Sequence, residues 1–182
     1  MPTSSGLDRR RKRTLTSLAF VAALASGGTA LGAPPAAAAD PVSVDYTCTG
    51  PGAPDGAQPL QVTMTAPATV PQGGTADLTV EVTTALTVPI GVPANGVTGE
   101  MEITLGGAGS GSVTATGFTN PGRIPSGSTV TLTGGVASVQ LDAAGTATFA
   151  PGNASVHVFG VTVACTVSGN APVAASTEVT PA

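Results

Sequence analysis

Apolar and polar residues alternate along several stretches of the chain, and a period of two is the pattern of a half-buried β-strand. The clearest case is 76–82, where small and aliphatic residues occupy the even positions and charged or hydroxyl residues the odd ones. No stretch shows a sustained helical period. The alternation predicts about nine or ten strands, at 42–48, 60–64, 76–82, 86–90, 97–105, 112–118, 128–133, 136–141, 146–150 and 155–167.

Two interruptions of the alternation predict how strands connect. Gly134 and Gly135 stand between the stretches 128–133 and 136–141, and two glycines in such a place predict a two-residue hairpin. The alternation changes phase again at Phe159–Gly160, where we expect a β-bulge within one long strand. The hairpin register places the apolar residues of both its strands on a single face: Val130, Leu132, Ala137, Val139 and Leu141.

The composition favours strands and turns over helices. Threonine and valine are abundant, and the chain holds 25 glycines and 16 prolines, which are all poor helix formers. Low-complexity disorder is the competing interpretation, but the regular alternation argues against it. We predict an all-β fold without a substantial helix, as an immunoglobulin-like β-sandwich of about nine or ten antiparallel strands. A closed barrel is the alternative, although uneven strand spacing and frequent breaks favour the sandwich.

The first 39 residues have the features of a secretory signal peptide. A basic segment at 9–13 precedes a stretch rich in alanine and leucine, and Ala37–Ala39 supplies the small residues that a signal peptidase requires. The general secretory route is favoured over the twin-arginine route, because Lys12 and Arg13 stand where twin-arginine signals prefer an apolar residue. An uncleaved membrane anchor is another alternative, but glycine and proline interrupt the stretch before it could span a bilayer.

These observations divide the chain into three expected segments. They are a signal peptide at 1–39, a β-sandwich domain at 40–170 and a flexible C-terminal tail at 171–182. We expect the mature protein to be secreted, either extracellular or associated with the cell envelope, without stable membrane insertion after signal cleavage.

Charge is distributed unevenly along the chain. Five of the six basic residues lie within 9–13, so Arg123 is the single base of the rest, against nine of the ten acids. Such an acidic body repels phosphate, and tryptophan is absent, so the sequence argues against a nucleic-acid partner, which requires a basic surface and stacking aromatics. A cell-wall polymer or an extracellular protein is the class of partner that we expect.

The two cysteines support the strongest structural inference. Cys48 is in phase with the apolar positions of the first stretch and Cys165 with those of the last, so both point into the core. In an oxidising compartment, two cysteines allow a single pairing. We predict a disulfide between Cys48 and Cys165 that joins the first strand to the last. A metal site or a catalytic thiol is disfavoured, because the sequence places no histidine or acid partner nearby.

Few residues offer catalytic chemistry. His157, the only histidine, is out of phase with its apolar neighbours and is expected to face solvent. Glu100 and Glu102 share the outer face of one strand at a spacing that a glycosidase pair could use. Sugar cleavage also needs aromatic platforms, and only 3% of the residues are aromatic. We therefore expect no enzymatic activity, no catalytic residues, no cofactor and no metal.

Five short motifs stand out along the chain, namely 45–51 (DYTCTGP), 60–63 (LQVT), 66–73 (APATVPQG), 88–89 (VP) and 163–165 (VAC). Together with the composition, rich in alanine, glycine, threonine and proline, they resemble the secreted β-sandwich domains of unknown function from high-GC actinobacteria. The resemblance implies an exported, disulfide-bonded protein of the cell envelope or the extracellular space. It implies no catalytic residues.

The function that we expect is non-catalytic: a secreted protein that acts by binding or by structural interaction. A carbohydrate-binding or adhesion module is the alternative, in which an exposed Tyr46 or Phe118 would stack on a sugar ring. A secreted hydrolase that uses Glu100 and Glu102 is less favoured.

Overall fold

The computed structural model describes residues 36–38 and 40–182. Within these residues every regular element is a strand and no helix is present, which confirms the all-β class. Apart from 36–38, the expected signal peptide lies outside the described residues. The strands are β1 (Ala36–Ala38), β2 (Val42–Thr49), β3 (Ala57–Pro67), β4 (Thr69–Pro71), β5 (Gly74–Thr87), β6 (Val97–Gly107), β7 (Ser112–Thr119), β8 (Thr129–Leu141), β9 (Gly145–Val158), β10 (Val161–Val167) and β11 (Ala175–Thr180).

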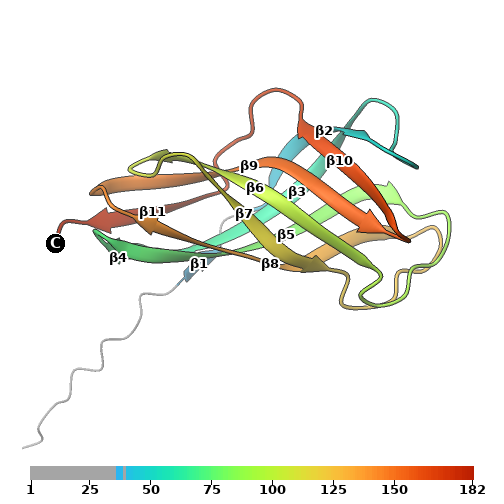
Figure 1. Ribbon diagram of the computed structural model, residues 1–182, viewed down its shortest axis with the longest axis horizontal. Helices are drawn as coiled ribbons and strands as arrows, with labels where there is room; N and C mark the ends of the chain where they lie inside the picture. The colour runs from blue at the N-terminus through green and yellow to red at the C-terminus, as the bar shows by residue number, and fades with distance from the viewer. Residues whose placement is uncertain (1–35, 39) are drawn as a thin grey trace, which may run out of the picture. The chain divides into compact units, whose positions relative to one another are not determined.

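Eight of the strands form a closed ring of hydrogen-bonded neighbours (Figure 1). Their order is β10-β2-β3-β5-β8-β7-β6-β9, and β10 also pairs with β9, so the series returns to its first member. All pairs within the ring are antiparallel. The immunoglobulin-like sandwich of two separate sheets is not confirmed, because all the described strands belong to one sheet.

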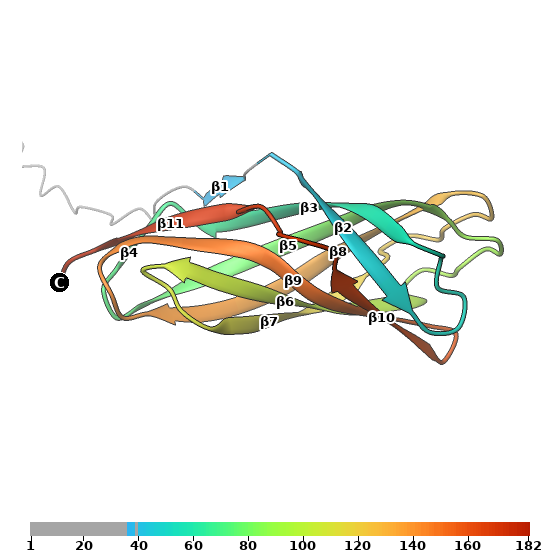
Figure 2. The same cartoon turned by 90° about the horizontal axis from the view of Figure 1, so that it is seen from above.

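Strand β9 joins the ring to the remaining strands. One of its edges pairs with β6, whereas the other pairs with β11 at 145–149 and then with β10 at 154–158. Figure 2 shows β11 and β10 at opposite ends of β9. Between these two ladders, Gly152 and Asn153 stand opposite the single residue Glu102, which is a β-bulge. The bulge changes the phase of β9 at the point where the strand changes partners.

Tyr46 ties β2 to this bulge. Its side chain is fully buried, and its hydroxyl donates a hydrogen bond of 2.8 Å to the carbonyl oxygen of Gly152. Desolvation raises the pKa of this hydroxyl well above the ordinary value for tyrosine, so the hydroxyl stays protonated and remains a donor. A bulged residue is left without a partner in the ladder, and Tyr46 supplies one from within the core.

The glycine pair at 134–135 does not form the predicted hairpin. Strand β8 continues through both glycines, and Thr133 and Gly134 together stand opposite Glu81 of β5. This second bulge uses the left-handed backbone of Gly134, whose φ is 79°. The prediction of the shared face is confirmed, since Leu132, Ala137 and Leu141 are buried and Val130 and Val139 are half-buried.

The two-residue hairpin lies instead at Phe159–Gly160, where a bulge was expected. Val158 and Val161 are direct partners across β9 and β10, so only two residues form the turn. Both have positive φ, 50° and 78°, as a type I′ turn requires. A bulky residue such as phenylalanine rarely adopts this conformation, which is why the sequence alone did not indicate a tight turn here.

Two other expectations are wrong. The stretch 86–90 is not a separate strand, because β5 runs to Thr87 and Pro89 has no backbone N–H with which to extend the ladder. The segment 171–182 is not a flexible tail, since it contains β11, which pairs antiparallel with β9 and parallel with β4. Its alternation buries Ala175, Thr177 and Val179, but the strand is short and built of small residues, so the sequence signal is weak.

The two bulges divide the ring into two parts that differ in packing. The packed half contains 74–80 of β5, 135–141 of β8 and 145–151 of β9, together with β4 and β11. Large side chains such as Leu78 and Phe149 are fully buried there. The open half contains 82–87 of β5, 129–132 of β8 and 154–158 of β9, together with β10 and the start of β6. Its inward residues are mostly valines that are half-buried.

We predict that Tyr46→Phe lowers the free energy of unfolding by about 1–2 kcal/mol at neutral pH, because the Gly152 carbonyl loses its donor. The wild-type protein should also lose stability as the pH rises above about 10, where the tyrosine of the unfolded chain ionises but the buried hydroxyl resists ionisation. Because the pKa of Tyr46 is higher in the folded protein than in the unfolded chain, its contribution to stability is complete below the pKa of the unfolded chain and is lost as the pH rises above it. Tyr46→Phe should lack this alkaline loss, and denaturant midpoints measured across pH would contradict the assignment if both proteins declined in parallel.

A second prediction concerns Gly135. A Cβ at this position would overlap the aromatic ring of Phe118, which is itself buried. We expect Gly135→Ala to destabilise the protein by about 1–3 kcal/mol through overpacking. Gly122→Ala is the matched control, because nothing lies within 4 Å of the Cβ position there. Thermal denaturation should show that Phe118→Leu restores part of the stability that Gly135→Ala removes. If the stability losses of the two substitutions simply add in the double variant, the overlap between the Gly135 Cβ position and the Phe118 ring is not the cause.

Candidate functional site

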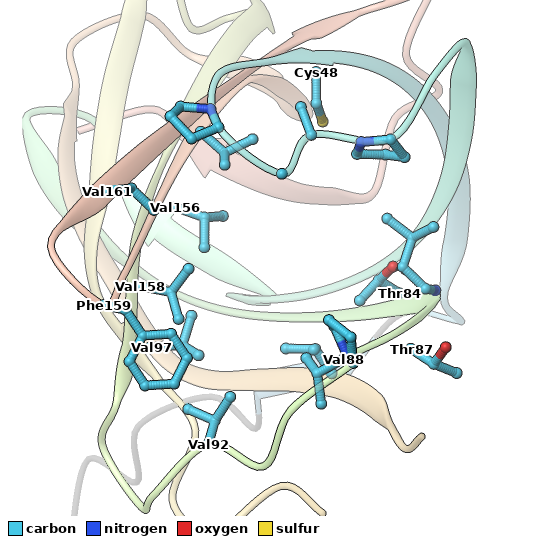
Figure 3. A pocket seen from close by; sticks show the side chains of 18 of the residues that line it. Cys48, Thr84, Thr87, Val88, Val92, Val97, Val156, Val158, Phe159 and Val161 are labelled. Carbon is cyan, nitrogen blue, oxygen red and sulfur yellow. The ribbon is translucent and has the colours of Figure 1, made fainter. Parts of the chain in front are cut away.

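The open half of the ring encloses an apolar cavity of about 390 Å³. Figure 3 shows labelled valines from β9, β10, the start of β6 and the segment that follows β5, arranged around one opening. The aliphatic side chains that line the cavity are Val82, Leu86, Val88, Ile90, Val92, Val97, Val130, Leu132, Val156, Val158, Val161 and Val163.

The alternation of the sequence creates this lining. After the bulge at Gly152, the inward positions of β9 are Ala154, Val156 and Val158, and the apolar phase then continues into β10. In the packed half, the corresponding inward positions carry residues such as Phe149 that fill the interior. The open half carries mainly valine, whose small side chain leaves space between the facing strands.

The rim of the cavity exposes large apolar side chains. Phe159 is 58% exposed at the hairpin between β9 and β10, and Ile90 is 59% exposed in the segment after β5. Both are lining residues, as is the loop 51–54 that follows β2. Exposed apolar side chains that gather at a cavity are typical of a binding surface, whereas single scattered ones are not.

The cavity lacks groups for acid–base chemistry. Thr84 and Thr87 are the only lining residues with a hydroxyl, and none of the lining side chains carries a charge. The Thr84 hydroxyl already accepts a hydrogen bond of 2.9 Å from the backbone N–H of Leu86. The site therefore has the means to bind an apolar group.

The predicted disulfide is confirmed and forms part of the cavity wall. Cys48 and Cys165 are direct partners in the β2–β10 ladder, and their sulfur atoms are bonded at 2.06 Å. The bridge joins β2 to β10, which is the last strand of the ring but not of the chain. Both cysteines line the cavity, so the covalent bond fixes one side of the open half.

The other residues singled out from the sequence lie on the outside. Glu100 and Glu102 point outward from β6, with Glu100 exposed and Glu102 half-buried. His157 is exposed, as predicted, and its Nδ1 lies 2.8 Å from the Thr162 hydroxyl oxygen. The register pairs His157 with Thr98 and Glu100 with Ser155, so histidine and glutamate share an outer face at diagonal positions. None of these residues lines the large cavity.

A second, smaller cavity of about 30 Å³ lies on the inner side of the ring, where it is lined mainly by inward residues such as Val82, Met101 and Leu132. Neither of the two cavities is lined by Glu102 or His157. Within the part of the chain that the structure describes, no three His, Cys, Asp or Glu residues gather where they could hold a metal ion.

The apolar cavity and its rim were not predicted from the sequence. The alternative of a sugar-binding module depended on an exposed Tyr46 or Phe118, and both side chains are buried. Among residues 36–38 and 40–182, the exposed aromatic residue is Phe159, for which a bulge within a strand was expected. One feature of the sequence could have indicated the cavity, namely the run of inward valines at 156–163, which no large side chain accompanies. These valines indicate a cavity only when the ring is known to close.

Among residues 36–38 and 40–182, we find no helix with the length and hydropathy that a membrane crossing requires. Comparison of the chain with protein-family models, with curated proteins and with solved structures found no match.

Proposed function

We propose that the protein is a non-catalytic extracellular binding protein that holds a small apolar molecule in the open half of its ring. The observation that supports this proposal is the cavity of about 390 Å³, whose lining is mainly apolar. Ligand pockets in proteins commonly measure about 300–1,000 Å³ and are lined mainly by apolar side chains. A closed sheet of about eight strands has space for one small ligand.

The energetics favour an occupant. Burial of apolar surface stabilises a protein or a complex by about 25 cal/mol for each Å² removed from water. The inward valines at 156, 158, 161 and 163 are only half-buried, so part of this gain is unrealised in the protein alone. An aliphatic ligand would complete the burial without any rearrangement of the strands.

The extracellular location is part of the proposal. A disulfide persists in oxidising compartments, and the Cys48–Cys165 bridge is compatible with export. The secretory features of 1–39 and the resemblance to the actinobacterial secreted domains support the same location. In that setting the protein would act at the cell envelope or in the medium, with a cell-wall component or an extracellular protein as a further partner.

The two alternatives find less support. A sugar-binding module needs exposed aromatic platforms, but Tyr46 and Phe118 are buried in the core, and Phe159 is the single exposed aromatic residue among 36–38 and 40–182. A hydrolase that uses Glu100 and Glu102 would need a substrate cleft next to them, and neither side chain lines the cavity of about 390 Å³.

The test is binding of Nile red, an uncharged apolar dye, to the purified protein with its disulfide intact. We expect saturable binding with a fluorescence increase. Val158→Trp should weaken it about tenfold or more, because an indole would fill the cavity that the half-buried valine lines. Val136→Trp is the matched control, since Val136 is 53% exposed and does not line the cavity. Absence of saturable binding, or equal weakening by both variants, would overturn the proposal.

A further inference from the structure

We infer that the natural ligand is an anionic amphiphile, with its aliphatic chain in the cavity and its head group at Arg123. This inference rests on the proposed function of the same site. The apolar cavity selects the chain but cannot select the head group, because none of its lining residues is charged. The rim supplies the missing specificity.

Arg123 is the only lysine or arginine among the described residues. The two segments that surround it, 88–96 and 121–128, contain no aspartate or glutamate, so no neighbour in either segment neutralises its charge. The remaining acids are distributed over the other strands and loops. A single cation on an acidic protein is a specific place for an anion to bind.

Backbone hydrogen bonds fix the segment that carries Arg123 to the rim of the cavity. Val92 and Ile124 exchange two backbone bonds, of 2.8 Å and 2.9 Å, and the N–H of Gly127 donates to the carbonyl of Val88 at 2.8 Å. Val88 and Val92 both line the cavity. Arg123 directly precedes Ile124, so the backbone hydrogen bonds of Ile124 hold Arg123 at the rim.

The guanidinium itself lies beside the rim. Its Nη2 atom is 3.5 Å from the position that a Cβ would take on Gly91, which stands between the lining residues Ile90 and Val92. A Cβ on Gly91 would be in ordinary van der Waals contact with the guanidinium, so the Arg123 side chain lies against the backbone of the rim segment 90–92. A guanidinium presents paired N–H donors in a plane, which suits a carboxylate or a phosphate head group.

Charge on the opposite side gives the ligand one orientation. Asp55 follows Pro54, which lines the cavity in the loop after Cys48. Figure 3 places Cys48 and Val92 on opposite sides of the opening. An anionic head is disfavoured near Asp55 and favoured near Arg123, so the chain enters with its head toward the segment 121–128.

The experiment compares laurate with dodecanol, which have the same chain length and differ in charge, as competitors of Nile red at neutral pH. For the wild-type protein we expect laurate to bind about fivefold more tightly, and this preference should shrink as salt is added. Arg123→Gln should abolish the preference while leaving dodecanol binding unchanged, which also shows that the variant is folded. Glu178→Gln, on β11 in the packed half, is the control that changes net charge elsewhere.

The outcomes separate this inference from the proposed function. If neither compound displaces the dye, both the apolar site and the inference fail. If both compounds bind but the wild type shows no preference for laurate, or Arg123→Gln retains that preference, the inference about the head group fails and the apolar site stands. Retention of part of the preference by Arg123→Lys would support a charge interaction at this position.

Discussion

The closure of the ring at β10 is the constraint on which the rest of the structure depends. This strand of seven residues must pair with β2 on one edge and with β9 on the other, and β9 can receive it because its pairing with β11 ends at Phe149. The Tyr46 hydroxyl donates a hydrogen bond to the bulge at Gly152 of β9 from inside the ring. The Cys48–Cys165 disulfide joins the other edge of β10 to β2. Without β10 the cavity would lose one wall.

The same closure explains why a packed core and an open cavity coexist in one small domain. The chain has few aromatic residues, and the largest buried ones lie in the packed half or at the bulges. Backbone hydrogen bonding keeps the strands of the open half at ring spacing even where valines are too small to fill the interior. The cavity therefore reflects a conflict between ladder geometry, which fixes the width, and side-chain volume, which falls short of it.

The period of two predicted most strands and the faces they bury, because alternation is a local property. The connections were harder to predict, since a bulge and a tight turn both shift the phase of the alternation. At Gly134–Gly135 the composition suggested a turn, and at Phe159–Gly160 it suggested a continuous strand, but each place has the other structure. The disulfide was predictable from two in-phase cysteines. The cavity was not, because it arises from β10 meeting strands that are distant in sequence.

The pairing of β1 with β3 has a consequence for maturation. Ala36–Ala38 pairs with Thr65–Pro67. These alanines belong to the segment 1–39, which the sequence predicts to be a cleaved signal peptide. In a processed chain, the outer edge of β3 at Thr65–Pro67 would be open to another strand. Pro67 lacks a backbone N–H, and proline is one of the residues by which proteins protect open edges from association. If the predicted cleavage occurs, residues 36–38 would cover until then a strand edge that is partly self-protecting afterwards.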